Sequence, residues 1–376
     1  MRKYVPYLII VFAILLNVIA RLSVSFCDSY VTYIFPAIVE VFGRLTSIFA
    51  FSVGEIMLYA AFIMLVLLLI GGFIYLFRKK MGKKDGRFLK IYQMYAQTCL
   101  WLTAIFSFIM TTNCFILYHC SAIHTFYAIG SGENQTREYG LAEISRLRDF
   151  VVEEANKLAT ELARDEQDYL IYEGDMALAA QLEMKRLGRE YSRLAGYYPH
   201  PKPMLLSNFF SQQYIMGYYF PFSMEANYNT TMYITNVLPT ICHELAHVKG
   251  FIYEDEANFL AFLACVDSDD PLFRYSGYLS VLYFLERDFI AALGNETEVY
   301  YEHPQISDLV RRDDIFLTPE AWEQVEKTAI FSTDFVRDIS NEIVEVNLIL
   351  NGVSDGALSY GRVVELLLMH YDGVLI

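Results

Sequence analysis

Three long apolar runs in the first third of the chain limit its fold more than any other feature. They cover about residues 5–20, 55–77 and 91–118, and each is long enough to cross a bilayer. The 376 residues are 55 % hydrophobic, with a mean hydropathy of +0.29, which is too apolar for an ordinary soluble protein. We therefore predict a membrane domain over residues 1–118 with three transmembrane helices.

The loop between the second and third runs is strongly basic. Residues 78–87 contain six basic side chains and one acidic side chain. The positive-inside rule makes this loop cytoplasmic and puts everything after the third run outside. The first run is interpreted as an uncleaved anchor, although residues 18–20 loosely resemble a signal-peptidase site, and cleavage there would not change the orientation. The alternative, buried helices of a large soluble core, does not explain so basic a loop.

The net charge also differs between the apolar first third of the chain and the remainder. Residues 1–118 carry a net charge of +7 and residues 119–376 a net charge of −22, which together give the formal −15 of the whole chain. An outer domain this acidic is repelled by phosphate backbones and by anionic headgroups, which argues against nucleic acid as a partner. We predict a multi-pass cell-membrane protein with an extracytoplasmic domain over residues 119–376.

The outer domain is expected to be α+β and mostly helical. Residues 141–163 and 176–195 show helical periodicity and predict two amphipathic helices packed as an antiparallel pair. Three prolines make residues 197–203 non-helical. Residues 204–233 are rich in Tyr, Phe, Ile and Thr and predict a few short strands, after which the pattern is again helical.

Residues 243–247 form the motif that carries chemistry, H-E-x-x-H, between Pro239, where a helix is expected to begin, and Gly250, where it should end. The two histidines differ by about 40° around such a helix, so both imidazoles can share a metal ion. Glu244 lies about 100° from His243, beside the metal rather than bound to it. Two imidazoles and a carboxylate suit Zn²⁺ and leave one position for water. The alternative is a pair of core histidines.

The third ligand is expected from the following segment. Residues 251–265 predict a second helix, with Glu254, Asp255 and Glu256 in its first turn. Glu256 lies beside a face of small residues that lets two helices approach closely, whereas Glu254 lies about 160° from that face and is expected to face solvent. The alternative for this cluster is favourable charge at a helix N-terminus, with no metal role.

Several blocks of the sequence resemble an uncharacterised bacterial family whose members have three N-terminal spans and an extracytoplasmic zinc-peptidase-like domain. The blocks are Ser52-Val53-Gly54-Glu55, Tyr219-Phe220-Pro221-Phe222, Glu225-Ala226-Asn227, Cys242-His243-Glu244-Leu245-Ala246-His247, Glu254-Asp255-Glu256-Ala257-Asn258-Phe259-Leu260-Ala261, Arg274-Tyr275-Ser276-Gly277-Tyr278 and Ser359-Tyr360-Gly361-Arg362-Val363-Val364. The resemblance covers nearly the whole chain, and the combination of blocks is highly specific. It implies a zincin-like metallopeptidase domain over residues 119–376.

The segment Glu256-Ala257-Asn258 is also similar to the glutamate-zincin peptidases that cleave repressors, in which the glutamate before Ala-Asn is the third zinc ligand. This similarity implies a zinc site formed by His243, His247 and Glu256. One departure is Val248-Lys249, where the uncharacterised family more often has Gln-Arg. That change is next to the site and is not expected to affect ligation.

Four further residues are weaker candidates for binding substrate. Asn227 and the strand over residues 219–229 are predicted to form an edge on which an extended peptide pairs through its main chain. An ordinary hydrophobic strand is the alternative. Arg274, Tyr275 and Tyr278 are candidate donors to a tetrahedral oxyanion.

These features favour a membrane-anchored zinc metallopeptidase that hydrolyses peptide bonds outside the cytoplasmic membrane. Glu244 would deprotonate the attacking water, and the partners would be a peptide or protein substrate and the lipid bilayer. The alternative is a catalytically silent, zincin-like binding or scaffold protein of the membrane. An intramembrane protease is disfavoured because Thr235, Asn236 and Lys249 put polar groups too close to the motif for lipid burial.

Overall fold

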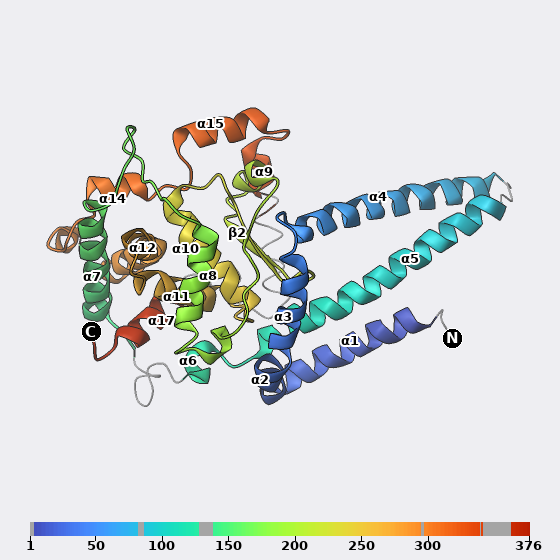
Figure 1. The fold of residues 1–376 in the computed structure, drawn as a ribbon, viewed down its shortest axis with the longest axis horizontal. Coiled ribbons are helices and arrows are strands. Elements are labelled where there is room, and N and C mark those ends of the chain that lie inside the picture. The colour runs from blue at the N-terminus through green and yellow to red at the C-terminus, as the bar shows by residue number, and fades with distance from the viewer. Residues whose placement is uncertain (1–3, 82–85, 128–137, 295–296, 339, 341–361) are drawn as a thin grey trace.

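The computed structural model describes residues 4–81, 86–127, 138–294, 297–338, 340 and 362–376. Long apolar helices project from one side of a mostly helical domain that contains one small sheet (Figure 1). Residues 82–85 of the basic loop and residues 359–361 of the last resemblance block lie outside the described residues.

Among the described residues, three helices are long and apolar enough to cross a membrane, and they project in the same direction (Figure 1). They are α1 (Val5–Leu22), α4 (Val53–Lys80) and α5 (Gly86–Met110), and α5 continues through a π-helical turn, η1 (Thr111–Phe115), and a 3-10 turn, η2 (Leu117–His119). The expected candidate spans are therefore confirmed.

Two helices connect the first span to the second. They are α2 (Val24–Tyr33) and α3 (Phe35–Thr46), bent by 44° and joined at Ile34. Pro36 lies in the first turn of α3, where its missing N–H is tolerated, so a single longer helix is interrupted here. Val31 and Phe35 pack against Gly250, where an added Cβ would lie 2.9 Å from Val31, so this connection touches the end of the motif helix.

Three helices form the centre of the mostly helical domain that follows the apolar helices. They are α10 (Ile234–Val248), α11 (Glu254–Val266) and α12 (Pro271–Leu293), and each packs against the other two. Around them, α7 (Leu141–Ala159) packs against α12, and α8 (Met176–Leu187) packs against α10 and α11. The predicted antiparallel pair of α7 and α8 is wrong, because the apolar stripe of each helix covers a central helix instead.

Short elements complete the domain. They are α6 (Ile123–Phe126), η4 (Ser192–Leu194), α9 (Ser207–Ser211), α13 (Thr297–Tyr300), α14 (Asp308–Asp313), α15 (Pro319–Thr328) and α17 (Val363–Tyr371). Of these, α17 packs against α11 and α12, so the end of the chain closes the core behind the motif.

The sheet has three short strands in the order β1-β3-β2. They are β1 (Lys202–Pro203), β2 (Gly217–Phe220) and β3 (Glu225–Tyr228). The central strand, β3, is parallel to β1 and antiparallel to β2, with Tyr219 opposite Ala226. Both β2 and β3 pack against α10. In the described part of the chain β2 pairs with β3 alone, so it is an edge strand beside the motif helix.

Candidate metal centre

The motif helix α10 begins earlier than Pro239 predicts. It starts at Ile234, and Pro239 lies inside it rather than at its first turn. The helix ends as expected, because Gly250 takes a φ of +90° and its N–H donates to the His247 carbonyl at 2.9 Å.

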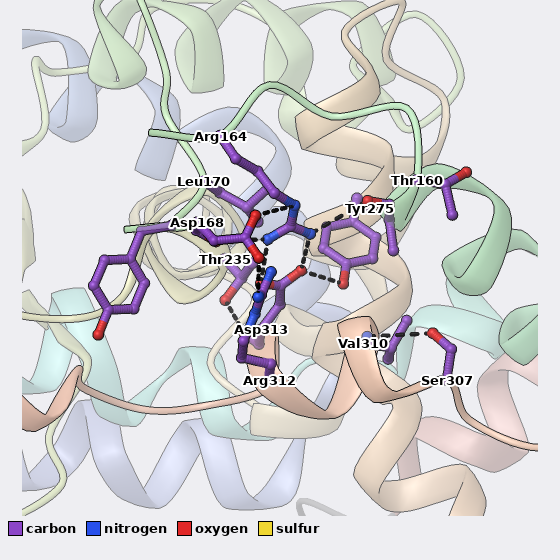
Figure 2. A network of polar contacts seen from close by, with 12 residues as sticks. Thr160, Arg164, Asp168, Leu170, Thr235, Tyr275, Ser307, Val310, Arg312 and Asp313 are labelled. Carbon is purple, nitrogen blue, oxygen red and sulfur yellow. Dashed lines mark hydrogen bonds and ion pairs between the residues drawn. The ribbon is translucent and has the colours of Figure 1, made fainter. Parts of the chain in front are cut away.

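A buried polar network explains the early start of α10 (Figure 2). The Thr235 hydroxyl donates to the main-chain carbonyl of Asp313 at 3.0 Å. The Asp313 carboxylate in turn accepts from Arg164 at 2.6 Å and from the Tyr275 hydroxyl at 2.9 Å. The Asn236 amide donates to the carbonyl of Ile315 at 2.7 Å. These bonds hold the first turn of α10 against the segment that follows α14 and so fix the position of the motif.

The two imidazoles of the motif face each other and present the same ring nitrogen to a common point. Their ring centroids are 4.5 Å apart. The Nδ1–H of His243 donates to Asn258 Oδ1 at 2.8 Å, and the Nδ1–H of His247 donates to the Phe251 carbonyl at 2.6 Å. Because both Nδ1 atoms face acceptors, each Nε2 is the ring atom that can exchange its proton for a cation.

The carboxylate at this common point belongs to Glu254. Its Oε2 lies 3.1 Å from His243 Nε2 and 3.6 Å from His247 Nε2, and the side chain is 18 % exposed. The three side chains offer ligand atoms that all lie within 4.8 Å of one another. The expectation that Glu254 faces solvent is wrong.

Glu256, the predicted third ligand, lies elsewhere. Its Oε1 accepts from the main-chain N–H of Ile123 at 2.6 Å, and it is fully buried away from both imidazoles. The reason is the tight turn after Gly250: only three residues separate it from α11, so the first residue of α11 reaches the motif. Two residues later the helix has turned by about 200°, which carries Glu256 to the opposite side.

Sequence reasoning also missed the role of Asn258. Glu254 and Asn258 are four residues apart and therefore share one face of α11, the face that meets α10. This i, i+4 pair of a carboxylate and an amide was the available signal.

The electrostatics of the three side chains fit a cation. Burial alone would lower the pKa of His247, but the Glu254 carboxylate raises it to about 9. Burial alone would raise the pKa of Glu254, but the charge of His247 and hydrogen bonds from both imidazoles hold it well below its usual range. A positive charge is therefore strongly stabilised at this point. Two imidazoles whose Nε2 atoms converge on one carboxylate form a donor set that suits a divalent transition metal such as zinc.

Glu244 lies beside this group without joining it. Burial raises its pKa to about 7, and the neighbouring histidines and the nearby main-chain N–H of Tyr219 partly oppose this shift. Its Oε2 has no hydrogen-bond partner among the described residues. A Cβ at Gly217 would lie 2.5 Å from Glu244 Oε1, so β2 can approach this closely only with glycine at that position.

The four weaker candidates lie in other places. Asn227 is on the central strand β3 and not on the edge, which is β2. The Tyr275 hydroxyl is engaged by Asp313 and cannot serve an oxyanion at the imidazoles. Arg274 donates to the Ser268 carbonyl at 3.4 Å, and Tyr278 packs edge-on against the rings of Phe150 and Phe262.

A comparison with protein families bears on the whole chain. The family model described as "Protein of unknown function (DUF3810)" matches residues 30–368. The chain belongs to this family. The DUF3810 match includes the two spans α4 and α5, the motif helix α10 and the helix α11 that carries Glu254. No curated protein and no solved structure gives a significant match.

Proposed function

We propose that this DUF3810 chain is a membrane-anchored zinc metallopeptidase that hydrolyses peptide bonds outside the cytoplasmic membrane. The observation that carries the proposal is the convergence of His243 Nε2, His247 Nε2 and Glu254 Oε2, with the buried carboxylate of Glu244 alongside. A group that only bound a metal would have no need for an additional buried acid beside it, because such an acid is costly to desolvate.

His243, His247 and Glu254 would hold the zinc ion, with Asn258 and the Phe251 carbonyl fixing the tautomer of each imidazole. When bound, zinc supplies a Lewis acid that polarises a carbonyl and acidifies water. Glu244 is the residue that accepts the proton of the attacking water at its carboxylate.

The edge strand β2 is suited to hold an extended substrate. Gly217 on this strand lies directly against the Glu244 side chain, and the main-chain N–H of Tyr219 is near the same carboxylate. A peptide that pairs with this edge would therefore pass directly over the proposed general base.

Charge near the spans supports the extracytoplasmic location. The span α4 ends in Arg78, Lys79 and Lys80, and the positive-inside rule assigns that end to the cytoplasm. The sheet and α10 are attached to the opposite end of α4, so the proposed catalytic groups would face the outside.

The test compares Glu244→Gln with the wild type and with Glu323→Gln, a control on the exposed surface of α15. Each full-length protein, purified in detergent, is assayed for bound zinc and is incubated with a peptide library whose products are identified by mass spectrometry. We expect one zinc per chain in all three proteins and a loss of hydrolysis of about 10²- to 10⁴-fold in Glu244→Gln alone.

Two results would count against the proposal. Equal cleavage by the wild type and Glu244→Gln would remove Glu244 from the mechanism. Zinc binding without cleavage by any of the three proteins would favour the silent binding or scaffold protein instead.

A further inference from the structure

The candidate metal centre is built directly on the end of the third span. The residue before Glu254 is Tyr253, whose hydroxyl donates to the carbonyl of Tyr118 at 2.6 Å, and Tyr118 lies in the turn that ends this span. Two residues after Glu254, Glu256 accepts from the N–H of Ile123 at 2.6 Å. The first turn of α11 is thus tied on both sides of Glu254 to residues 118–123.

The edge strand β2 is attached to the same span. The ring of Tyr219 lies 6.5 Å from the ring of His247, and its hydroxyl donates to the carbonyl of Asn113 at 3.1 Å. The Asn113 amide donates back to the Pro221 carbonyl at 2.7 Å. One tyrosine side chain therefore connects an imidazole of the site to the π-helical turn of the span.

The second span is joined to the other end of β2 and to β3. A Cβ at Gly54 would lie 2.5 Å from the ring of Phe220, so the first turn of α4 is in close contact with the strand. The Glu225 carboxylate accepts from the N–H of Val53 at 3.1 Å and from that of Gly54 at 2.6 Å. Glu225 is also paired with the buried ammonium of Lys202.

These contacts limit how far Glu244 can stand from the bilayer. From Gly217, beside Glu244, to Phe220, beside Gly54, the strand advances three residues, or about 10 Å. The 28 residues of α4 extend about 42 Å, of which about 30 Å are needed for the hydrocarbon core. At most about 12 Å of α4 projects, so Glu244 lies within about 22 Å of the hydrocarbon, whatever the direction of the strand.

Two exposed leucine side chains lie close to the first turn of α4, at the end of the second span. The N–H groups of Leu205 and Leu206 donate to the carboxylate of Glu55, in the first turn of α4, at 2.7 Å and 3.0 Å. The two leucine side chains are 50 % and 48 % exposed. Exposed leucines at the end of a span suit the boundary between headgroups and acyl chains.

We propose that the substrate is the juxtamembrane segment of another membrane-anchored polypeptide, which pairs with β2 as it leaves the bilayer. The inference rests on the proposed peptidase function and adds the substrate class. An extended chain covers about 22 Å in about seven residues, so a segment close to its own anchor can reach Glu244. Anchoring in the same bilayer also raises the effective concentration of such a substrate into the millimolar range.

The test uses the full-length protein reconstituted in liposomes of phosphatidylcholine and phosphatidylglycerol. The probe is a library of peptides with about 24 randomised residues after a dipalmitoyl anchor. This length lets an anchored peptide extend well past the site. The comparison is the same library without the anchor. Cut positions are counted from the anchor by mass spectrometry, and Glu244→Gln in the same liposomes gives the background.

We expect cuts to begin within about ten residues of the anchor and the anchored library to be cut at least about tenfold faster at micromolar concentration. Equal rates for the two libraries, or cuts only beyond about 20 residues from the anchor, would overturn the substrate class and leave the peptidase function standing. Absence of cleavage in both libraries by a zinc-loaded protein would overturn both.

Discussion

The assignment of Glu254 rather than Glu256 to the metal can be tested with two matched substitutions. Both are glutamates in the first turn of α11 with little or no exposure, but only Glu254 has an oxygen within 3.6 Å of both imidazole Nε2 atoms. Glu254→Gln removes the negative charge that a cation would contact. Glu256→Gln keeps an oxygen that can accept from Ile123.

The two substitutions are expected to change different quantities, Glu254→Gln the zinc affinity and Glu256→Gln the free energy of unfolding. Loss of a residue that only supports a ligand typically costs 10- to 100-fold in metal affinity, so loss of a ligand carboxylate in Glu254→Gln should exceed about 100-fold, or about 2.7 kcal/mol. Glu256→Gln should leave zinc affinity within about threefold. It should lower the free energy of unfolding by less than the roughly 1.5–3 kcal/mol of a charged hydrogen bond, since a neutral bond to Ile123 remains.

The assay is a zinc titration of each full-length protein against a chromophoric chelator, with thermal unfolding recorded on the same samples. The assignment would be refuted if Glu256→Gln lost zinc and Glu254→Gln retained it. That result would restore the sequence-based ligand set and would require α11 to be rotated about its axis by about 160°.

Three more predictions concern the surroundings of the site. Gly217→Ala should reduce hydrolysis by about 100-fold with zinc retained, because the new Cβ displaces Glu244 by roughly an ångström, and peptide cleavage with a zinc assay measures both; unchanged activity would mean that β2 does not contact Glu244. Asp313→Ala should lower the free energy of unfolding by about 1.5–3 kcal/mol, measured with denaturant, because Arg164 and Tyr275 lose the buried carboxylate that accepts from both; a loss below about 1 kcal/mol would show that the network in Figure 2 does not anchor α10. Alkaline phosphatase fused after Cys120 should be active and the same fusion after Lys84 inactive; the reverse would contradict the proposed orientation.

Local patterns in the sequence predicted the features that depend on one segment alone. The three candidate spans follow from the lengths of the apolar runs, and the shared face of His243 and His247 follows from helical periodicity. The carboxylate that joins the two histidines, Glu254, could not be derived from local patterns, because its position depends on the path of the chain between α10 and α11. The orientation of α11 is set by the turn after Gly250 and by bonds from Tyr253 and Glu256 to residues 118–123, more than 130 positions earlier in the chain.

Tyr275 illustrates the same limit. Its spacing gave no sign that Asp313, 38 residues later, would accept its hydroxyl hydrogen and remove it from any site. Asp313 has no distinguishing pattern in the sequence either, since the run Arg311-Arg312-Asp313-Asp314 resembles ordinary surface charge. Its burial and its four partners arise only when the segment after α7 and the helices α10, α12 and α14 are brought together.

The carboxylate that caps α4 also has a consequence for biosynthesis. Glu225 follows Val53 by 172 residues, so the second span enters the bilayer long before its cap has been translated. Until β3 arrives, the first N–H groups of α4 are left to water and headgroups. The last-made strand of the sheet, together with Lys202, therefore completes the first turn of α4 and its connection to α3. If the chain were cut between the third span and β3, the first turn of α4 would lose its cap. The released fragment would expose an ion pair that is buried in the intact protein. Insertion and folding are therefore steps of one assembly.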